Sequence, residues 1–257
     1  MTGTAVLFPT CVVDGVRPQV GVATVRLLRA RGFRVELARS TTCCGQPAWN
    51  AGQVDAAARV ARTTLAGLEE AGGDVVVVPA GSCATMIRRF WPELFRLAGE
   101  PGAAERAEAL GQRVRELSEL LAGLPAGLPA AGAAPGQADR GPGQAASAGP
   151  VVYHRSCHML RELGIAEAPE QVLDGAGVER VANPTAGTCC GFGGLFAVKL
   201  PEASVAMADH VLDGCVASGA ATVVGCDASC LLQLEGRARR RRLPLAFRHL
   251  AEVLAPE

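Results

Sequence analysis

The sequence predicts an α/β fold made of two pseudo-repeated halves, each a small parallel sheet with flanking helices. In both halves, short apolar runs rich in β-branched residues alternate with helical stretches, which is typical of buried parallel strands. Eight of the ten cysteines follow one spacing that is used twice. Residues 121–150 consist mostly of Ala, Gly and Pro, so we interpret them as a linker. We therefore expect a first domain over residues 1–120 and a second over residues 151–257.

The first half begins with an apolar run, TAVLFPTC, that is expected to form a strand leading to Cys11. A helix over Gln19–Arg31 and a second strand, FRVELA, follow it. A polar turn then carries two adjacent cysteines and a glycine, the first CCG sequence, and a helix is predicted over Val54–Ala71. The run DVVVVPAGSC is expected to be a buried strand that ends shortly before Cys83.

The second half repeats this order. The run PVVYHRSC leads to Cys157, and helical stretches are expected over Cys157–Leu163 and Pro169–Gly175. The strand VERVAN precedes the second CCG sequence, the next helix covers Pro201–Ser218, and the run ATVVGCDASC ends at Cys230. The cysteines of both halves thus follow the carboxyl ends of predicted strands, where open α/β sheets usually bind their ligands.

The end of the chain is expected to add a helix, a short strand and a final helix to the second half. The helix is predicted over Leu231–Arg242, the strand over the sequence LPLAF, and the final helix over Arg248–Leu254.

The cysteine spacing indicates an internal duplication. In each half, 31 residues separate a lone cysteine from the CCG pair, and 38 or 39 residues separate the pair from the last cysteine. Each copy is therefore expected to gather four thiolates into one metal site. The two sets are Cys11, Cys43, Cys44 and Cys83 in the first half, and Cys157, Cys189, Cys190 and Cys230 in the second.

Thiolates are soft ligands that suit iron–sulfur clusters, Zn²⁺ or Cu(I). Adjacent cysteines do not readily place both sulfurs on one zinc ion, whose sites favour C-x₂₋₄-C spacing, whereas a cluster offers several metal corners. Gly45 and Gly191 provide freedom for positive φ or close backbone approach. A zinc site, a vicinal disulfide switch and ordinary packed cysteines remain the alternatives.

Composition excludes several classes of function. The chain has 25 basic and 25 acidic residues and a net charge of zero, which argues against nucleic acid as a partner. No apolar run approaches the ~20 residues that a membrane span needs. Since the N-terminus also does not resemble a signal peptide, we expect a cytoplasmic protein in which cysteines serve metal or redox chemistry rather than disulfides.

The spacing C-x31-CC-x38/39-C, present twice with a glycine directly after each CC pair, resembles the cysteine-rich CCG domain. That domain occurs in the cysteine-rich subunit of heterodisulfide reductase, in the iron–sulfur subunit of glycolate oxidase and in lactate utilization protein A. The lactate utilization branch is the most similar, on the stretches VVPAGSCATMIR, VVYHRSCHMLRELGI, CCGFGGLFAVKLPEAS, DASCLLQLEGR and HLAEVL. No ferredoxin-type C-x₂-C-x₂-C run precedes the first domain, unlike the glycolate oxidase type.

The resemblance implies an iron–sulfur electron-transfer subunit of a cytosolic complex that oxidises L-lactate to pyruvate. It implies two clusters, of the [4Fe–4S] type, held by the two sets of four cysteines. It also implies two partners, a ferredoxin-type iron–sulfur subunit and a third small subunit, so the chain would be part of an oxidoreductase. Two alternatives stay open: a heterodisulfide-reductase-like or glycolate-oxidase-like subunit acting on another substrate, and a zinc-binding structural or sensor protein.

The sequence departs from the fullest form of the family motif, which ends in C-x-x-C and so supplies a fifth thiolate. Ala80 and Asp227 stand where the extra cysteines would lie, which puts heterodisulfide-type chemistry in doubt. Cys226, displaced by one position, is a possible ligand. Asp227 is expected to be a capping residue before Cys230 rather than a ligand, and Cys215 is expected to pack in the core.

Two histidines flank Cys157. His154 and His158 are either donors to cluster sulfur and proton relays or strand-end and helix-start residues with ordinary hydrogen bonds. The run Arg239–Arg242 is interpreted as a solvated helix end, with a docking patch for an acidic partner as the alternative.

Overall fold

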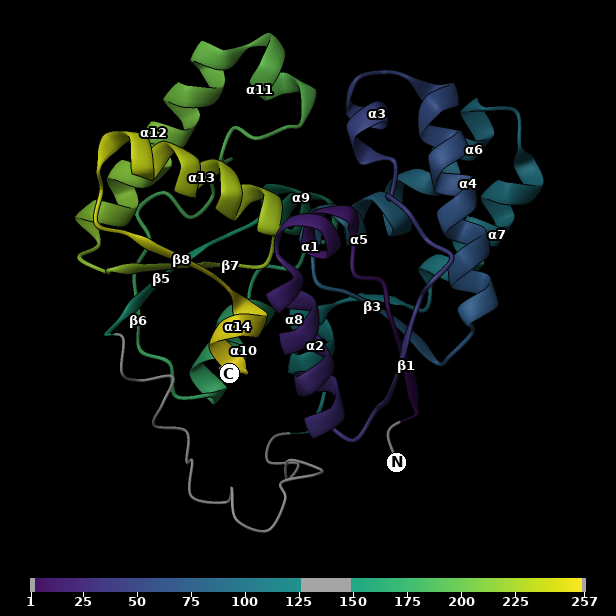
Figure 1. The fold of residues 1–257 in the computed structure, drawn as a ribbon, viewed down its shortest axis with the longest axis horizontal. Helices are drawn as coiled ribbons and strands as arrows, with labels where there is room; N and C mark the ends of the chain where they lie inside the picture. Colours follow the sequence, from purple (N-terminus) through teal and green to yellow (C-terminus); the bar gives the residue numbers. More distant parts are fainter. Residues whose placement is uncertain (1–2, 126–148, 256–257) are drawn as a thin grey trace.

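The computed structural model describes residues 3–125 and 149–255. Within these residues the chain forms two four-stranded sheets, in the orders β2-β1-β3-β4 and β6-β5-β7-β8. Every strand pairing is parallel, and helices flank both sheets (Figure 1). The predicted fold class, two repeats each with a small parallel sheet and flanking helices, is confirmed.

The first repeat contains four strands and a larger number of helices than the second. Its elements are β1 (Thr4–Leu7), α1 (Cys11–Val16), α2 (Pro18–Ala30), β2 (Arg34–Leu37), α3 (Gln46–Asn50), α4 (Val54–Ala71), β3 (Val75–Val78), α5 (Gly81–Thr85), a π-helical turn η1 (Met86–Phe90), α6 (Trp91–Leu97), α7 (Pro101–Gly111), β4 (Val114–Glu116) and α8 (Leu117–Ala122).

The second repeat replaces the helices between the third and fourth strands with a single helix. Its elements are β5 (Val151–His154), α9 (Cys157–Glu162), α10 (Ala168–Gly175), β6 (Arg180–Val181), α11 (Leu195–Lys199), α12 (Pro201–Ala217), β7 (Thr222–Gly225), α13 (Ala228–Arg241), β8 (Ala246–His249) and α14 (Leu250–Leu254).

The central strands are apolar because helices cover both of their faces. Strand β3 reads VVVV and β7 reads TVVG, and both are almost fully buried. Such continuous runs are the signature of parallel strands covered on two sides. The helix predicted over Val54–Ala71 has these bounds in the structure. It buries Ala57, Ala61 and Leu65 against the sheet and ends where Gly72 takes a positive φ of 66°.

The end of the chain is not an addition to the second repeat but its fourth strand and last helix. Val78 pairs with Glu116 in β4, and Gly225 pairs with His249 in β8, so β4 and β8 are equivalent. The final helix predicted over Arg248–Leu254 is present, but it begins two residues later, at Leu250, because β8 continues to His249, whose side chain caps α14 in a capping box.

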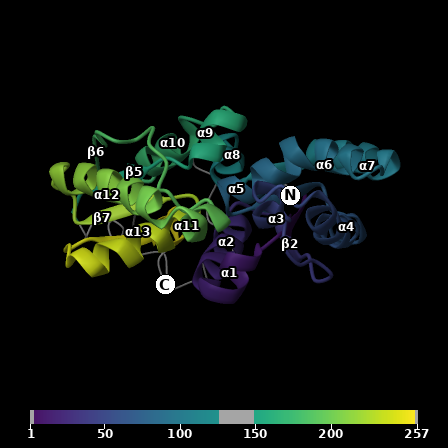
Figure 2. The same ribbon diagram turned by 90° about the horizontal axis from the view of Figure 1, so that it is seen from above.

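Three pairs of helices join the two repeats. Helix α2 packs on α14 and α8 packs on α10, while α5 lies against α9 (Figure 1). One hydrophobic cluster includes Val13 and Leu28 of the first repeat together with Ala228 and Ala251 of the second. The view from above (Figure 2) shows α2, α8 and α10 in the middle, with α6 and α7 at one end and α12 and α13 at the other. Each repeat therefore covers the inner face of the other.

The predicted linker lies only in part within the described residues. Helix α8 extends to Ala122, two residues beyond the expected end of the first domain, and β5 begins at Val151. Residues 126–148 lie outside the described residues. Over residues 3–125 and 149–255, no helix combines the length and the apolar character needed to cross a bilayer.

Candidate thiol sites

Three neighbouring strands of each sheet supply the cysteines. In the first repeat, Cys11 begins α1 after β1, the CCG sequence follows β2, and Cys83 lies in α5 after β3. In the second repeat, Cys157 begins α9 after β5, and Cys230 lies in α13 after β7. Because parallel strands end at one edge of a sheet, these segments meet there. The structure thus brings each predicted set of four cysteines together, and we name the sets the first and second thiol quartets.

The first thiol quartet forms a continuous chain of sulfur contacts. The Sγ atoms of Cys11 and Cys43 lie 3.6 Å apart, and those of Cys44 and Cys83 lie 3.3 Å apart. Cys11 is exposed, Cys43 is partly buried, and Cys44 and Cys83 are buried. No sulfur is joined to another in a disulfide, since all four cysteines are free.

The second thiol quartet has the same arrangement. The Sγ atoms of Cys157 and Cys189 lie 3.7 Å apart. The Sγ atoms of Cys190 and Cys230 lie within 4.8 Å of each other and of a ring nitrogen of His154. Cys157 and Cys189 are partly buried, while Cys190 and Cys230 are buried. The outer pair and the inner pair of thiols therefore recur in both repeats.

Each CCG turn needs its glycine. Gly45 and Gly191 take φ values of 86° and 80°, which side chains rarely adopt. A Cβ on Gly45 would lie 2.9 Å from the carbonyl oxygen of Ala57, and one on Gly191 would lie 2.5 Å from that of Ser204. The backbone N–H of each glycine points to the sulfur of the first cysteine of its pair, at 3.5 Å in the first turn and 3.4 Å in the second.

Buried side chains hold the first CCG turn in place. The indole Nε1–H of Trp91 donates to the carbonyl of Cys44 at 2.8 Å, and the hydroxyl of Thr64 donates to the carbonyl of Cys43 at 2.8 Å. Trp91 is fully buried. These bonds satisfy two carbonyls that would otherwise lack partners in a loop between β2 and α3.

Each thiol quartet favours one thiolate at the first cysteine of its CCG pair. Hydrogen bonds from the neighbouring thiols lower the pKa of Cys43 to about 3 and that of Cys189 to about 2. The same bonds, with burial, raise the pKa values of Cys11 and Cys44, and of their equivalents Cys157 and Cys190. Further thiolates repel the first, so four of them require a bound cation.

The first thiol quartet borders a cavity of about 570 Å³. Its lining includes Thr10, Cys11, Arg39 and Cys43. Thr10 is buried and takes a φ of 66°, ahead of Cys11. A non-glycine residue in this region is strained, and such residues cluster at functional sites. The first quartet is therefore reachable from outside through its outer pair of thiols.

The two histidines beside the second quartet differ in their surroundings. His154 is 2% exposed, and neither ring nitrogen has a hydrogen-bond partner among the described residues. Burial lowers the pKa of His154 to about 4, so the ring is neutral at physiological pH. His158 is partly buried, and its Nδ1 lies 3.8 Å from the sulfur of Cys157.

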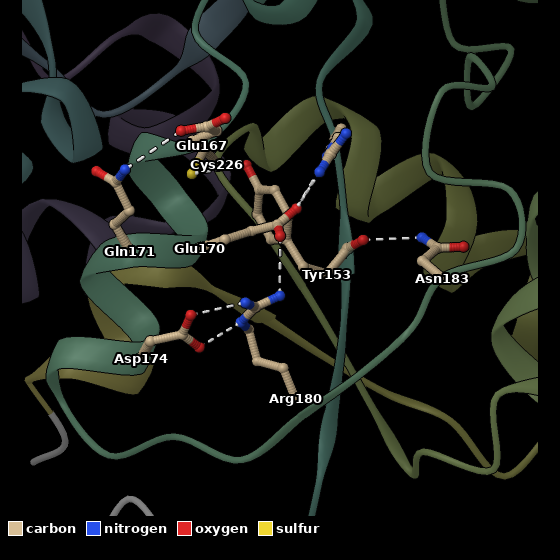
Figure 3. Close-up of polar contacts among 9 residues, drawn as sticks. Tyr153, Glu167, Glu170, Gln171, Asp174, Arg180, Asn183 and Cys226 are labelled. Atoms are coloured by element: carbon tan, nitrogen blue, oxygen red, sulfur yellow. Dashed lines mark hydrogen bonds and ion pairs between the residues drawn. The ribbon is translucent and has the colours of Figure 1, made fainter.

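The two remaining cysteines lie in other surroundings. The hydroxyl of Tyr153 donates to the sulfur of Cys226 at 3.3 Å, and Figure 3 shows the Tyr153 ring reaching towards Cys226. Cys226 packs in a hydrophobic cluster with Tyr153 and Met159, whereas Cys190 and Cys230 belong to the cluster on the other side of the sheet. Cys215 is fully buried in α12, as expected for a core residue.

Asp227 is a capping residue, as predicted. Its carboxylate accepts the backbone N–H of Ser229 at 3.2 Å at the start of α13. It also accepts the backbone N–H of Ser82, next to Cys83 of the other repeat, at 2.8 Å. The backbone N–H of Gly81 donates to the carbonyl of Cys226 at 3.2 Å. The segments that carry Cys83 and Cys230 are therefore hydrogen-bonded to each other.

A sequence profile of the cysteine-rich CCG domain matches residues 5–88 and 151–235, one match in each repeat. The chain is 37% identical over 249 residues to lactate utilization protein A of an Exiguobacterium species, covering 96% of this chain and 95% of the relative. It is 36% identical to lactate utilization protein A of Geobacillus thermodenitrificans and 38% identical to that of Macrococcus caseolyticus, each over 96% of this chain. These cover 97% and 94% of the two relatives.

The chain belongs to the lactate utilization protein A family. Its two domain matches end at residues 88 and 235, before β4 and β8, so the structural repeat is longer than the matched domain. The eight cysteines of the two quartets all lie within the two matches to the cysteine-rich domain. Four sulfurs gathered as an outer and an inner pair suit a soft metal ion or an iron–sulfur cluster.

Sequence reasoning missed several residues that shape the sites. Glu116 and His249 are equivalent buried residues that end β4 and β8 and cap the following helices. The similarity between VRELSELL and FRHLAEVL indicated that the two segments form equivalent strand ends and helices. The strain at Thr10 and the bond from Trp91 to Cys44 had no signal in the sequence. Of the arginine run, Arg239 and Arg241 form ion pairs with acidic residues of α12 and α13.

Proposed function

We propose that the chain is the electron-transfer subunit of a cytoplasmic complex that oxidises L-lactate to pyruvate, and that each thiol quartet holds one [4Fe–4S] cluster. Cys11, Cys43, Cys44 and Cys83 would bind the first cluster, and Cys157, Cys189, Cys190 and Cys230 the second. The chain would then be one part of an oxidoreductase rather than a complete enzyme. A cluster in each quartet would supply one-electron transfer.

The observation that carries this proposal is the presence of two equivalent thiol quartets on hydrogen-bonded segments. Oxidation of L-lactate to pyruvate releases two electrons and two protons. Two one-electron centres take up that pair when each accepts one electron. The bond from the Ser82 N–H to Asp227 links the helices that carry Cys83 and Cys230, so it supports exchange of electrons between the quartets.

The thiol environment also supports a cationic occupant. Each quartet favours a single thiolate without a metal, and binding of the remaining sulfurs as thiolates releases protons. Cys226 is left out of the ligand sets because its sulfur accepts a bond from Tyr153 in another cluster. Asp227 is left out because both of its carboxylate oxygens already accept backbone N–H groups.

The partners in this proposal are a ferredoxin-type iron–sulfur subunit and a third small subunit. The cavity beside the exposed Cys11 is where we place the exchange of electrons with a partner, because transfer is fast only over short distances. Oxidation of the substrate itself would take place on a partner, since no hydride-accepting cofactor site is evident in this sequence.

The test is reduction of the clusters by substrate. The tagged chain is isolated without oxygen from lactate-grown cells together with its partners, and the visible absorbance is followed after L-lactate is added. The proposal expects bleaching with L-lactate in the wild type and in Cys215→Ala, and its loss in Cys44→Ala and Cys190→Ala. Bleaching with glycolate or a thiol but not with L-lactate would favour another substrate. A colourless zinc-containing protein would favour the structural alternative.

A further inference from the structure

The two thiol quartets differ at one position that faces the inner pair of sulfurs. The sheet register makes Leu7 of β1 equivalent to Tyr153 of β5, since they pair with the equivalent residues Val77 and Val224. The next residue is Phe8 in the first repeat and His154 in the second. Phe8 is fully buried and His154 is 2% exposed. The same place in the fold therefore holds a carbon ring in one repeat and an imidazole in the other.

Alternation along the strand directs both rings to the sulfurs. Val6 and Phe8 belong to the hydrophobic cluster that contains Cys44 and Cys83. Val152, two residues before His154, belongs to the cluster that contains Cys190 and Cys230. Side chains two apart on a strand share a face, and a ring nitrogen of His154 lies within 4.8 Å of both of these sulfurs. His154 thus borders the second quartet as Phe8 borders the first.

The buried imidazole of His154 has polar ring nitrogens that need hydrogen-bond partners, whereas the phenyl ring of Phe8 has none. Neither ring nitrogen of His154 has a partner among the described residues. A buried N–H without an acceptor costs ~1–3 kcal/mol, a cost that Phe8 avoids at the equivalent place. The sulfurs of Cys190 and Cys230, which lie within 4.8 Å of a ring nitrogen, are able to accept such a bond, as is a group that those sulfurs bind.

We propose that His154 donates a ring N–H hydrogen bond to a sulfur of the cluster in the second quartet, and thereby makes the second cluster easier to reduce than the first. This inference rests on the proposed function. A hydrogen bond to cluster sulfur stabilises the reduced state, which carries one more negative charge, and so raises the reduction potential. His154 is a positioning and tuning residue in this proposal, and it is neither a ligand nor a proton donor to substrate.

The consequence is a direction for electrons. The first quartet is exposed at Cys11 and borders the cavity, whereas the thiols of the second quartet are at least partly buried. An electron entering at the first cluster would move to the second because the potential there is higher. The chain would hold its first electron away from the exposed site.

The test compares reciprocal variants of the full chain, purified without oxygen. Potentials of both clusters are measured by redox titration monitored by electron paramagnetic resonance. His154→Phe gives the second repeat the residue of the first and is expected to shift one potential downward. Phe8→His is expected to shift the other potential upward, which assigns the two signals. His154→Gln keeps an N–H and is expected to restore part of the shift. His210→Ala, at an exposed position of α12, is the matched control with both potentials unchanged.

A second readout identifies the bond itself. Pulsed electron paramagnetic resonance is applied to the reduced wild-type protein with ¹⁵N-labelled histidine, in ordinary and in deuterated buffer. The spectra are expected to show an exchangeable proton and a weakly coupled nitrogen. Both signals are expected to disappear in His154→Phe. A strongly coupled nitrogen would mean direct ligation and would overturn the proposal. Unchanged potentials in His154→Phe with full iron content would also overturn it, while leaving the proposed function in place. A wild-type chain without iron would overturn both.

Discussion

The two repeats share a scaffold and differ in what lines their sites. Both have the same strand order, a CCG turn built on a positive-φ glycine, and a capping box at the start of the last helix. Three equivalent pairs differ in chemistry: Phe8 and His154, Ala80 and Asp227, Glu116 and His249. Backbone geometry is therefore what brings thiols together, and it tolerates exchange of the residues around them.

The three pairs identify positions beside the thiol sites whose side chains can change while the fold is kept. The three pairs replace apolar or acidic groups of the first repeat with imidazole or carboxylate groups in the second, all of them buried. Buried polar groups cost stability unless they have partners. Two of the three pairs, Phe8 with His154 and Ala80 with Asp227, place the buried polar group in the second repeat only, which indicates that the two sites are not used in the same way.

The largest expected effect comes from removing one thiol of an inner pair. Cys44→Ala and Cys190→Ala are each expected to lose about half of the iron and sulfide, because a cluster needs four thiolates and the quartets are separate. The double variant is expected to lose nearly all of it. Iron and acid-labile sulfide are measured per chain, with Cys215→Ala as the matched control that keeps both. Equal loss in Cys215→Ala would contradict the assignment of ligands.

Substitution of the CCG glycines compares how strongly each of the two turns is destabilised by a side chain. Gly191→Ala is expected to cost ~3 kcal/mol, the sum of a left-handed conformation and a displaced backbone contact. Gly45→Ala is expected to cost less, since its Cβ would lie 2.9 Å rather than 2.5 Å from the nearest carbonyl oxygen. Thermal unfolding measures both. The control is Gly52→Ala, which has a φ of 72° but no atom within 4 Å; a larger loss there would refute the steric argument.

The capping residues Glu116 and His249 predict pH dependences of opposite sign. Burial raises the pKa of Glu116 to about 7 from 4.5, against bonds from Ser118 and with repulsion from Glu119. The folded chain therefore holds the proton more tightly than the unfolded chain, and this stabilisation is lost as the pH rises from about 4.5 through 7. Glu116→Gln does not ionise, so its stability relative to the wild type is expected to improve by about 3 kcal/mol across that window.

The contribution of His249 to stability has the opposite pH dependence. Burial lowers its pKa, so the neutral ring stabilises the fold above about pH 6.5, and that contribution is lost as the pH falls below it. His249→Gln is expected to flatten the acid side of the stability profile. Unfolding midpoints between pH 5 and 8 measure both variants, with the exposed Glu93→Gln as the control. A Glu116→Gln profile parallel to the wild type would show that Glu116 does not titrate in this range.

The smallest expected effect is at the connection between the repeats. Asp227→Ala removes the acceptor for Ser229 and for Ser82 and is expected to cost ~1–2 kcal/mol. Asp227→Asn keeps an acceptor oxygen and is expected to cost less. The iron content of both variants should stay at the wild-type level. Loss of iron in Asp227→Asn would instead make Asp227 a ligand.

The sequence was sufficient to predict the fold class and which cysteines lie together in each repeat. Val75–Val78 is a continuous apolar run, Val54–Ala71 has a helical pattern, and the duplicated spacing is visible in the sequence alone. Boundaries at the end of the chain failed, because His249 ends a strand and caps a helix at once. That role depends on the pairing of His249 with Gly225, a contact between distant residues.

The residues around the sites were harder to predict for the same reason. His154 was visible beside Cys157, but its equivalence to Phe8 follows from the sheet register. The carboxylate of Asp227 was expected to cap α13, yet its second bond, to Ser82, crosses between repeats. Local patterns predict elements, whereas contacts between the repeats arise only when the chain is folded.

The most direct test of the central claim is the metal content of the chain purified without oxygen. Iron, acid-labile sulfide and zinc are measured per chain, together with the visible spectrum. Two four-iron clusters predict about eight iron and eight sulfide per chain and a brown protein. Zinc in the absence of sulfide would contradict the claim that the two thiol quartets carry electrons.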